Sequence, residues 1–235
     1  MITTLFALSA AALAAEPMGD PTRAGQLLTV DLMGHGDQHN EAVEDCEGDR
    51  CLAGSATRAG NVRLGLRPHE AVGAWVDLGY GETTLSGAGH KAFGPSVGGG
   101  INLTWPTTGP RPALVVRGGY DRSVAEGGDG ARSTATGWEL EVSALLAVGG
   151  PTHEVAAWVG PVASVLGAQT VSVPADDVLL SLRPQIPVGL VAGAELFSIP
   201  LGPPWSTSGP RLMVGGEVRG IDAWGASVWI GLAAF

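Results

Sequence analysis

The residues of this 235-residue chain that could do chemistry are few and scattered along the sequence. His35 and His39 flank Asp37, and together they could offer two imidazoles and a carboxylate to a divalent metal. The stretch around them is polar, so we interpret all three as solvated side chains of a loop. No Ser, His and Asp trio is spaced so that a nucleophile would meet its base. We therefore expect no catalytic site, no metal site and no cofactor.

The two cysteines, Cys46 and Cys51, bracket the polar residues 47–50. In an oxidising compartment such a pair closes a small loop. A metal site would need two further ligands at suitable spacing, and the chain has no second cysteine pair. We expect a disulfide between Cys46 and Cys51.

The composition excludes several classes of protein. Charged residues make up only 15% of the chain, below the roughly 25% of soluble domains. The 37 glycines disfavour a helical bundle, because glycine is a poor helix former. The net charge of −10 argues against nucleic acid as a partner, since phosphate binding needs a basic face.

The first residues have the pattern of an export signal. Residues 1–15 are apolar, and Ala12-Leu13-Ala14 offers a cleavage site between small residues. The alternatives are a buried N-terminal helix or a single anchor. We expect a cleaved signal peptide over 1–15, a short lead over 16–24, and one β-barrel domain over 25–235.

Hydrophobicity with a period of two runs through the rest of the chain. Around residue 140, for example, Trp138, Leu140 and Val142 share one face, and Glu139 and Glu141 share the other. We expect ten strands, near residues 25–33, 59–67, 71–80, 93–105, 113–124, 135–148, 154–171, 185–197, 210–219 and 223–235. Pro161 falls inside one of them and predicts a β-bulge there.

Turn lengths alternate between these strands. Compact connections rich in Pro or Gly alternate with longer, polar ones at 34–58, 81–92, 125–134 and 172–184. Short turns at one end and long loops at the other are typical of outer-membrane barrels. The sequence thus predicts an all-β fold, a closed antiparallel transmembrane barrel of about ten strands, with eight as the alternative.

Which face looks inward decides the class of protein. The polar faces carry charges that would form a lumen ionic network: Arg63, Arg67, Asp77, Arg117, Asp121, Glu139, Glu141, Glu195, Glu217 and Arg219. Lys91 is the only lysine, and arginine suits buried ion pairs better than lysine does. Four aromatic residues end strands on the apolar face, as a girdle at the membrane interface would: Tyr80, Trp105, Trp138 and Trp224. These features favour a barrel with its apolar face outward, although Trp75 lands on the inner face.

The exported N-terminus, the amphipathic strands, the alternating turns and the C-terminal Phe235 resemble the small outer-membrane barrels of the OmpA/OmpX type. The resemblance implies outer-membrane localisation, contact with lipid and lipopolysaccharide, and recognition of Phe235 by the barrel assembly machinery. It implies a structural or surface-interacting role without catalysis. The acidic loops would bind divalent cations where they face lipopolysaccharide.

Three alternatives remain open. A soluble, exported barrel or sandwich would bind an apolar ligand inside and keep its charges outside. A lipid-modifying enzyme would need a His and a Ser or carboxylate clustered at the outer rim. The charged lumen could be plugged, which we expect, or it could be a small water-filled pore.

Overall fold

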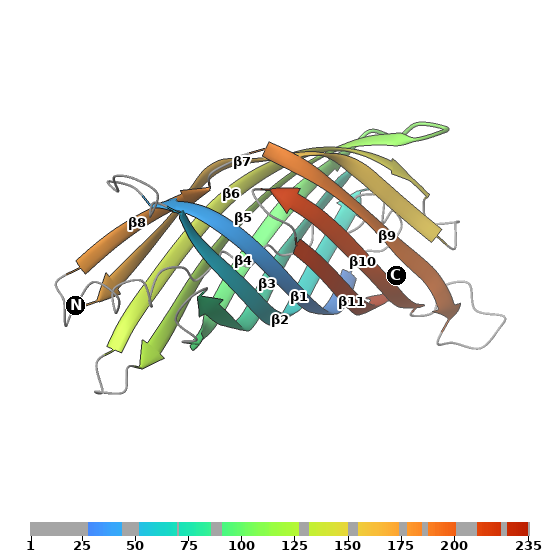
Figure 1. Cartoon of the computed structure of the whole chain (residues 1–235). Helices are drawn as coiled ribbons and strands as arrows, with labels where there is room; N and C mark the ends of the chain where they lie inside the picture. Colours follow the sequence, from blue (N-terminus) through green and yellow to red (C-terminus); the bar gives the residue numbers. More distant parts are fainter. Residues whose placement is uncertain are drawn as a thin grey trace.

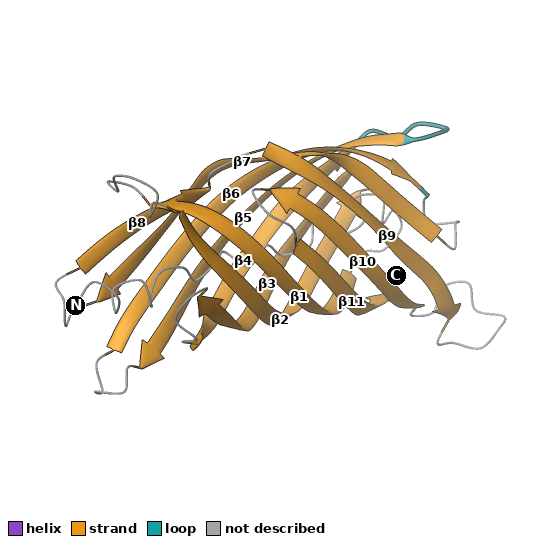
Figure 2. Cartoon of the chain, viewed as in Figure 1, coloured by secondary structure: helices purple, strands orange, loops and turns teal. Residues whose placement is uncertain are grey.

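The computed structural model describes residues 28–43, 52–69, 71–85, 91–126, 132–149, 155–173, 178–184, 188–200, 211–221 and 225–234. The regular structure of these residues is all β (Figures 1 and 2). The strands are β1 (Leu28–Val43), β2 (Leu52–His69), β3 (Val72–Leu85), β4 (Lys91–Thr104), β5 (Arg111–Glu126), β6 (Arg132–Val148), β7 (Val155–Val173), β8 (Val178–Pro184), β9 (Val188–Pro200), β10 (Arg211–Ile221) and β11 (Gly225–Ala234). No described helix is long and apolar enough to cross a membrane.

Ten of these strands close into an antiparallel barrel. Their order is β11-β10-β9-β7-β6-β5-β4-β3-β2-β1. The seam lies between β1 and β11, which pair from Leu28↔Ala234 to Asp37↔Gly225. Closure leaves no unpaired sheet edge, so the backbone N–H and C=O groups can be satisfied without water. The expected ten-stranded barrel is confirmed, and each of the ten expected ranges overlaps one barrel strand. The eight-stranded alternative is wrong at the end of the barrel where β1 pairs with β11.

The other end of the barrel is closed differently. The short strand β8 pairs with the last residues of β7 and, through Glu41↔Pro184 to Val43↔Leu182, with the last residues of β1. Strands β9 and β11 begin lower, opposite Ala163 of β7 and Asp37 of β1. Eight strands, β1 to β8, therefore form the ring at this end, and ten form it at the other.

The structure corrects the expected long loops. Most of residues 34–58, 81–92 and 125–134 belong to extended strands, and 178–184 form β8. His35, Asp37 and His39 thus lie on β1 and not in a loop. The cause is physical: beyond the apolar band both faces of a strand are polar, so the period-two pattern that reveals a strand disappears.

Two prolines interrupt their ladders on one side only. Pro95 pairs with Tyr80 on β3, but the β4–β5 register passes from Phe93↔Val124 directly to Ser96↔Asp121. Pro161 pairs with β9 and has no partner on β6, because proline has no N–H to donate. The bulge expected at Pro161 lies four residues later: Leu140 pairs with Leu166 and Glu141 with Ser164, which leaves Val165 as the extra residue.

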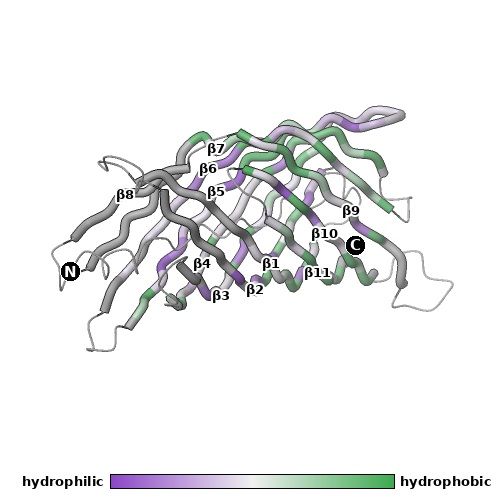
Figure 3. The backbone as a smooth tube through the Cα atoms, viewed as in Figure 1, coloured by the Kyte–Doolittle hydropathy of each residue, from purple (hydrophilic) through white to green (hydrophobic). Residues whose placement is uncertain are grey.

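The apolar face of the barrel looks outward. Each of the ten barrel strands exposes at least one large apolar side chain, with Leu32, Leu190 and Val228 between 59% and 66% exposed. Among the charged residues, Asp77 and Glu195 are completely buried. Apolar and polar residues both recur along the described strands (Figure 3). The expected orientation, apolar outward and charged inward, is confirmed.

Candidate functional site

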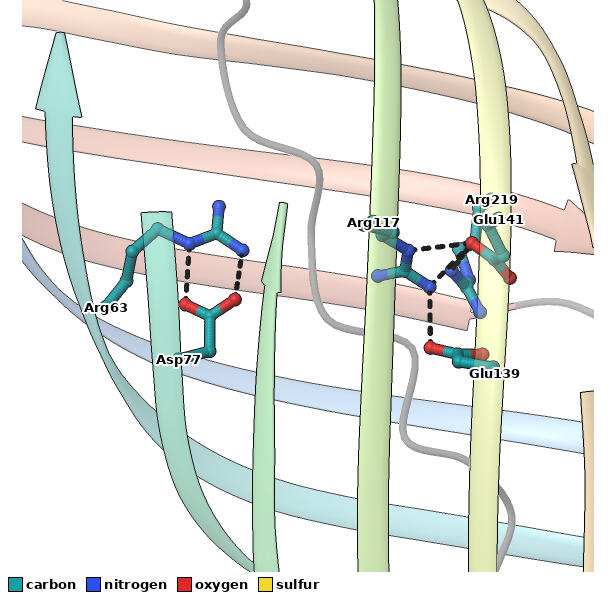
Figure 4. Close-up of polar contacts among 6 residues, drawn as sticks. All are labelled: Arg63, Asp77, Arg117, Glu139, Glu141 and Arg219. Atoms are coloured by element: carbon teal, nitrogen blue, oxygen red, sulfur yellow. Dashed lines mark hydrogen bonds and ion pairs between the residues drawn. The ribbon is translucent and has the colours of Figure 1, made fainter. Parts of the chain in front are cut away.

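The lumen is the part of the barrel where functional side chains gather. Arg63 on β2 and Asp77 on β3 face each other in register. The Arg63 guanidinium donates from Nε at 2.7 Å and from Nη2 at 2.8 Å to the two carboxylate oxygens of Asp77 (Figure 4). Its Cζ also lies 4.9 Å from the ring centre of Trp75. This two-point ion pair with a stacked aromatic ring is the geometry that arginine offers and lysine does not.

A second ionic cluster joins opposite walls of the barrel. Arg117 on β5 donates to Glu141 on β6 at 2.7 Å and to Glu139 at 3.2 Å. Arg219 on β10 donates to the same Glu141 oxygen at 3.0 Å (Figure 4). In the sheet order β7 and β9 separate β6 from β10, so this contact crosses the interior. One buried carboxylate thus holds two guanidiniums and ties the walls together.

Two tryptophans occupy the interior beside strands β7 to β11. Trp158 on β7 donates its indole N–H to Glu217 on β10 at 3.1 Å. Trp229 on β11 donates to Glu195 on β9 at 2.7 Å. The two rings stack with centroids 6.0 Å apart and planes at 27°. Both carboxylates are buried. The indole N–H groups replace hydrogen bonds to water that the carboxylates lose on burial.

Each inward-facing tryptophan lies over a glycine of the adjacent strand. Trp158 pairs with Gly193, Trp229 with Gly215 and Trp75 with Gly100. A Cβ at any of these glycines would collide with the ring of its partner. Only glycine therefore permits the indole to lie flat across the neighbouring strand, and this explains why Trp75 can face inward.

Apolar side chains fill the space around the two tryptophans. One buried cluster packs against Trp158 and Trp229, and its members come from β1, β5, β6, β7, β9 and β10: Met33, Ala113, Val115, Leu145, Ala147, Val162, Val191 and Ile221. The interior is thus partly a core and not only a polar surface. An interior of about eight strands is just wide enough for side chains to fill, and this barrel has ten.

The residues expected to form the ionic network all lie on the inner side. Arg67 donates to Thr104 Oγ1 at 3.1 Å. Asp121 lies on the inner face of β5, in register with Ser96. Glu195 and Glu217 accept hydrogen bonds from the two indoles. The charges of the inner wall thus take part in contacts with tryptophan as well as in arginine–carboxylate pairs.

Other expected residues are outside the lumen or outside the described part of the chain. Tyr80, Trp105 and Trp138 are exposed on the outer surface. The remaining girdle residue Trp224, the cysteines Cys46 and Cys51, the C-terminal Phe235 and residues 1–27 lie outside the described residues. Within the ranges that the structure describes, no group of three or more His, Cys, Asp or Glu is placed to hold a metal ion.

Sequence patterns alone missed the tryptophan–glutamate pairs. Trp158 lies in a stretch where the alternation is blurred by Pro161, and Trp229 lies on the face of the last strand opposite the apolar row of Val228, Ile230 and Leu232. The pattern that could have revealed these pairs is a tryptophan whose partner on the neighbouring strand is a glycine and whose neighbour on the strand beyond is a glutamate. That pattern needs the register between strands, which a single sequence does not supply.

The fold and the lumen define a closed antiparallel β-barrel with an apolar exterior and an ion-paired interior. No family model and no curated protein matches the chain. Among solved structures, the translocator domain of autotransporter NalP from Neisseria meningitidis is 14% identical, covers 90% of this chain and 89% of that one, and has a TM-score of 0.49. The transport unit of autotransporter AIDA-I from Escherichia coli is 9% identical, with 100% and 96% covered and a TM-score of 0.45.

A third structure, the beta domain of the Bordetella autotransporter BrkA, is 13% identical, covers 88% of this chain and 98% of that one, and has a TM-score of 0.39. Identities this low transfer no residue roles. With TM-scores below 0.5, the three structures carry no argument about the role of this chain, and the OmpA/OmpX resemblance remains a proposal. What the lumen does follows only from the residues of this chain.

Proposed function

We propose that this chain is an integral β-barrel of a bacterial outer membrane, with a closed lumen and a structural or surface-interacting role. The observation that carries the proposal is the pairing of an apolar exterior on all ten strands with buried ion pairs inside. Water would penalise so much exposed apolar surface, whereas lipid would not.

The height of the apolar exterior supports this. On β3 the outward residues run from Val72 to Tyr80; along β4 they run from Phe93 to Trp105, which directly follows the last residue of the strand. At about 3.4 Å per residue and a tilt of about 40°, these spans rise about 21 Å and about 31 Å along the barrel axis. The apolar band of outer-membrane barrels is about 25 Å tall. Tyr80, Trp105 and Trp138 are then suited to the interfaces.

The filled interior supports a closed lumen. The Glu141 cluster bridges β5, β6 and β10, and the stacked indoles with their apolar neighbours occupy the space beside β7 to β11. A role in bulk solute passage would need this interior to be vacated. We also propose that the barrel is of the OmpA/OmpX type and has no catalytic activity. Its acidic loops would bind cations and contact lipopolysaccharide, and Phe235 would be recognised during assembly.

The competing soluble carrier needs the opposite arrangement of faces. Its apolar row would line a cavity, yet Ile101 and Val188 are 49% and 60% exposed. Its charges would meet water, yet Glu141 and Arg219 are 2% and 7% exposed. The observed faces therefore favour the membrane barrel.

Two experiments test the proposal. In a Gram-negative host, the expressed chain should fractionate with outer membrane and run as a heat-modifiable band; recovery as a freely soluble periplasmic protein would refute membrane insertion. In planar bilayers the refolded chain should give no steady, large open-channel currents. Such currents would refute the closed lumen while leaving the location intact.

A further inference from the structure

One row of the inner wall, on strands β2 to β6, is lined by oxygen atoms. Asn61 on β2, Gly79 on β3, Ser96 on β4, Asp121 on β5 and Gly137 on β6 are successive partners in the sheet. Ser123 is the next inward residue on β5 and is 5% exposed. The side chains of this row are thus carboxylate, hydroxyl and amide, with glycines between them.

Three oxygen atoms in this row are buried and have no hydrogen-bond partner among the described residues: Ser96 Oγ, Asp121 Oδ1 and Ser123 Oγ. Burying a polar atom without a partner costs free energy, and burying a carboxylate costs more. Native proteins rarely leave such atoms unsatisfied. We therefore look for a group beyond the described residues that these oxygens would bind.

The glycines of the row let its polar side chains approach one another. A Cβ at Gly79 would collide with the Asn61 carboxamide and with Ser96 Oγ, so these two side chains occupy the space over the glycine. Opposite Asp121 on β6 is Gly137, and its inward neighbour on β5 is Gly119. No side chain from these positions covers the Asp121 carboxylate.

The charge of the lumen favours a cation. The described inner wall carries seven carboxylates, Asp31, Asp77, Asp121, Glu139, Glu141, Glu195 and Glu217, and five arginines, Arg63, Arg67, Arg111, Arg117 and Arg219. Arg117, the inward arginine of β5 nearest to Asp121 in sequence, is directed to Glu139 and Glu141. Within the described residues no side chain forms an ion pair with Asp121. A cation at Asp121 would offset part of the excess negative charge.

We propose that Asp121, Ser96 and Ser123, with the Asn61 carboxamide beside them, form a lumenal site for a hard, oxygen-liganded cation, with Ca²⁺ as the cation to test. Hard cations prefer carboxylate, hydroxyl and amide oxygens, and Ca²⁺ tolerates irregular geometry. The site lies inside the barrel and is separate from the acidic loops. It depends on the closed fold and does not depend on where in the cell the barrel is found.

The test uses the full chain refolded in a nonionic detergent without lipopolysaccharide, with Cys46 and Cys51 unchanged. Calcium chloride is titrated calorimetrically, and the midpoint of the heat-modifiable gel transition is measured with and without Ca²⁺ at constant ionic strength. In the wild type we expect heat of binding and a higher midpoint with Ca²⁺. Asp121→Asn should weaken binding at least tenfold, and Ser123→Ala or Ser96→Ala about threefold to tenfold.

Matched controls separate this site from the rest of the chain. Ser143→Ala removes another buried serine whose oxygen has no hydrogen-bond partner, and Glu217→Gln removes a lumenal carboxylate near the tryptophans; both should bind Ca²⁺ as the wild type does. The acidic loops are the same in every variant, so a change in Ca²⁺ binding cannot come from them. Undiminished Ca²⁺ binding by Asp121→Asn would overturn the site, and so would a wild type that binds no Ca²⁺. If Asp121→Asn does not fold, Ser123→Ala and Ser96→Ala serve as the test: Ca²⁺ binding that neither change weakens would overturn the site.

Discussion

Trp158 and Trp229 stack with each other, and each reaches across the glycine of the neighbouring strand to a glutamate on the strand beyond. Strand β9 carries the glycine that lies under Trp158 and the glutamate that accepts from Trp229; β10 carries the reverse pair. The two arrangements interlock across four strands, β7, β9, β10 and β11. Packing and buried hydrogen bonding thus depend on the same two rings.

Adding a methyl group under one of these rings should loosen the whole arrangement. Gly193→Ala places a Cβ against the Trp158 ring, which must then move away from Glu217. We expect a loss of about 1–3 kcal/mol in the free energy of unfolding, measured by urea titration of the refolded protein followed by tryptophan fluorescence. Gly34→Ala is the control, because a Cβ there meets nothing within 4 Å; an equal effect of both changes would argue against the proposed contact.

Breaking the Arg63–Asp77 pair on one side should cost more than replacing both partners. Arg63→Met leaves the Asp77 carboxylate buried without its two-point donor. The expected loss is about 3–5 kcal/mol, whereas the double change Arg63→Met with Asp77→Leu should recover most of it. Unfolding free energies of the two single variants and the double variant give the coupling. Additive losses in the double variant would mean that the pair does not act as a unit.

Emptying the interior should create a conducting pore. The double change Trp158→Gly with Trp229→Gly removes both rings and leaves Glu195 and Glu217 lining the space. In planar bilayers we expect steady, cation-selective currents from this variant and none from the wild type, because two carboxylates would then line the opened space. Trp105→Gly, which removes an exposed outer tryptophan, should stay closed. A silent double variant would show that other side chains close the lumen.

The ring formed by β8 can be tested by cross-linking. Ala42 and Arg183 are Cα partners across the β1–β8 ladder, and such partners lie about 4.5–5.5 Å apart, within the range that a disulfide spans. In a chain with Cys46 and Cys51 replaced by serine, Ala42→Cys with Arg183→Cys should oxidise to a bond that changes gel mobility without reductant. Gly54→Cys with Arg183→Cys is the mismatched control, because Gly54 pairs with Asn40 on β1 and not with β8. Equal yields for both pairs would refute the register.

The sequence was sufficient to predict which residues face inward and which face outward. The alternation of Trp138, Leu140 and Val142 with Glu139 and Glu141 places the two sets on opposite faces whatever the register. The contacts of Glu195 and Glu217 could not be predicted in this way. They depend on β9 lying beside β7, which in turn depends on the intervening β8 leaving the wall at that level.

Strand β8 was missed for a different reason. It follows β7 in sequence, has seven residues and begins with three consecutive apolar ones, so no period-two pattern marks it. Its partner on β1 is more than a hundred residues away, so no local pattern records the pairing. Asp121 was assigned to the ionic network because charge alone does not show that Ser96 and glycines would be its neighbours.

The unequal rings of the barrel also bear on how the molecule assembles. Three residue pairs join β8 to β1, against ten that join β11 to β1, and both contacts unite segments distant in the chain. Contacts between distant segments form slowly, after shorter-range hairpins are in place. The β7–β8 hairpin can therefore fold early, and its docking on β1 closes the eight-stranded ring, so protection of the β8 amides from hydrogen exchange would report when that ring closes.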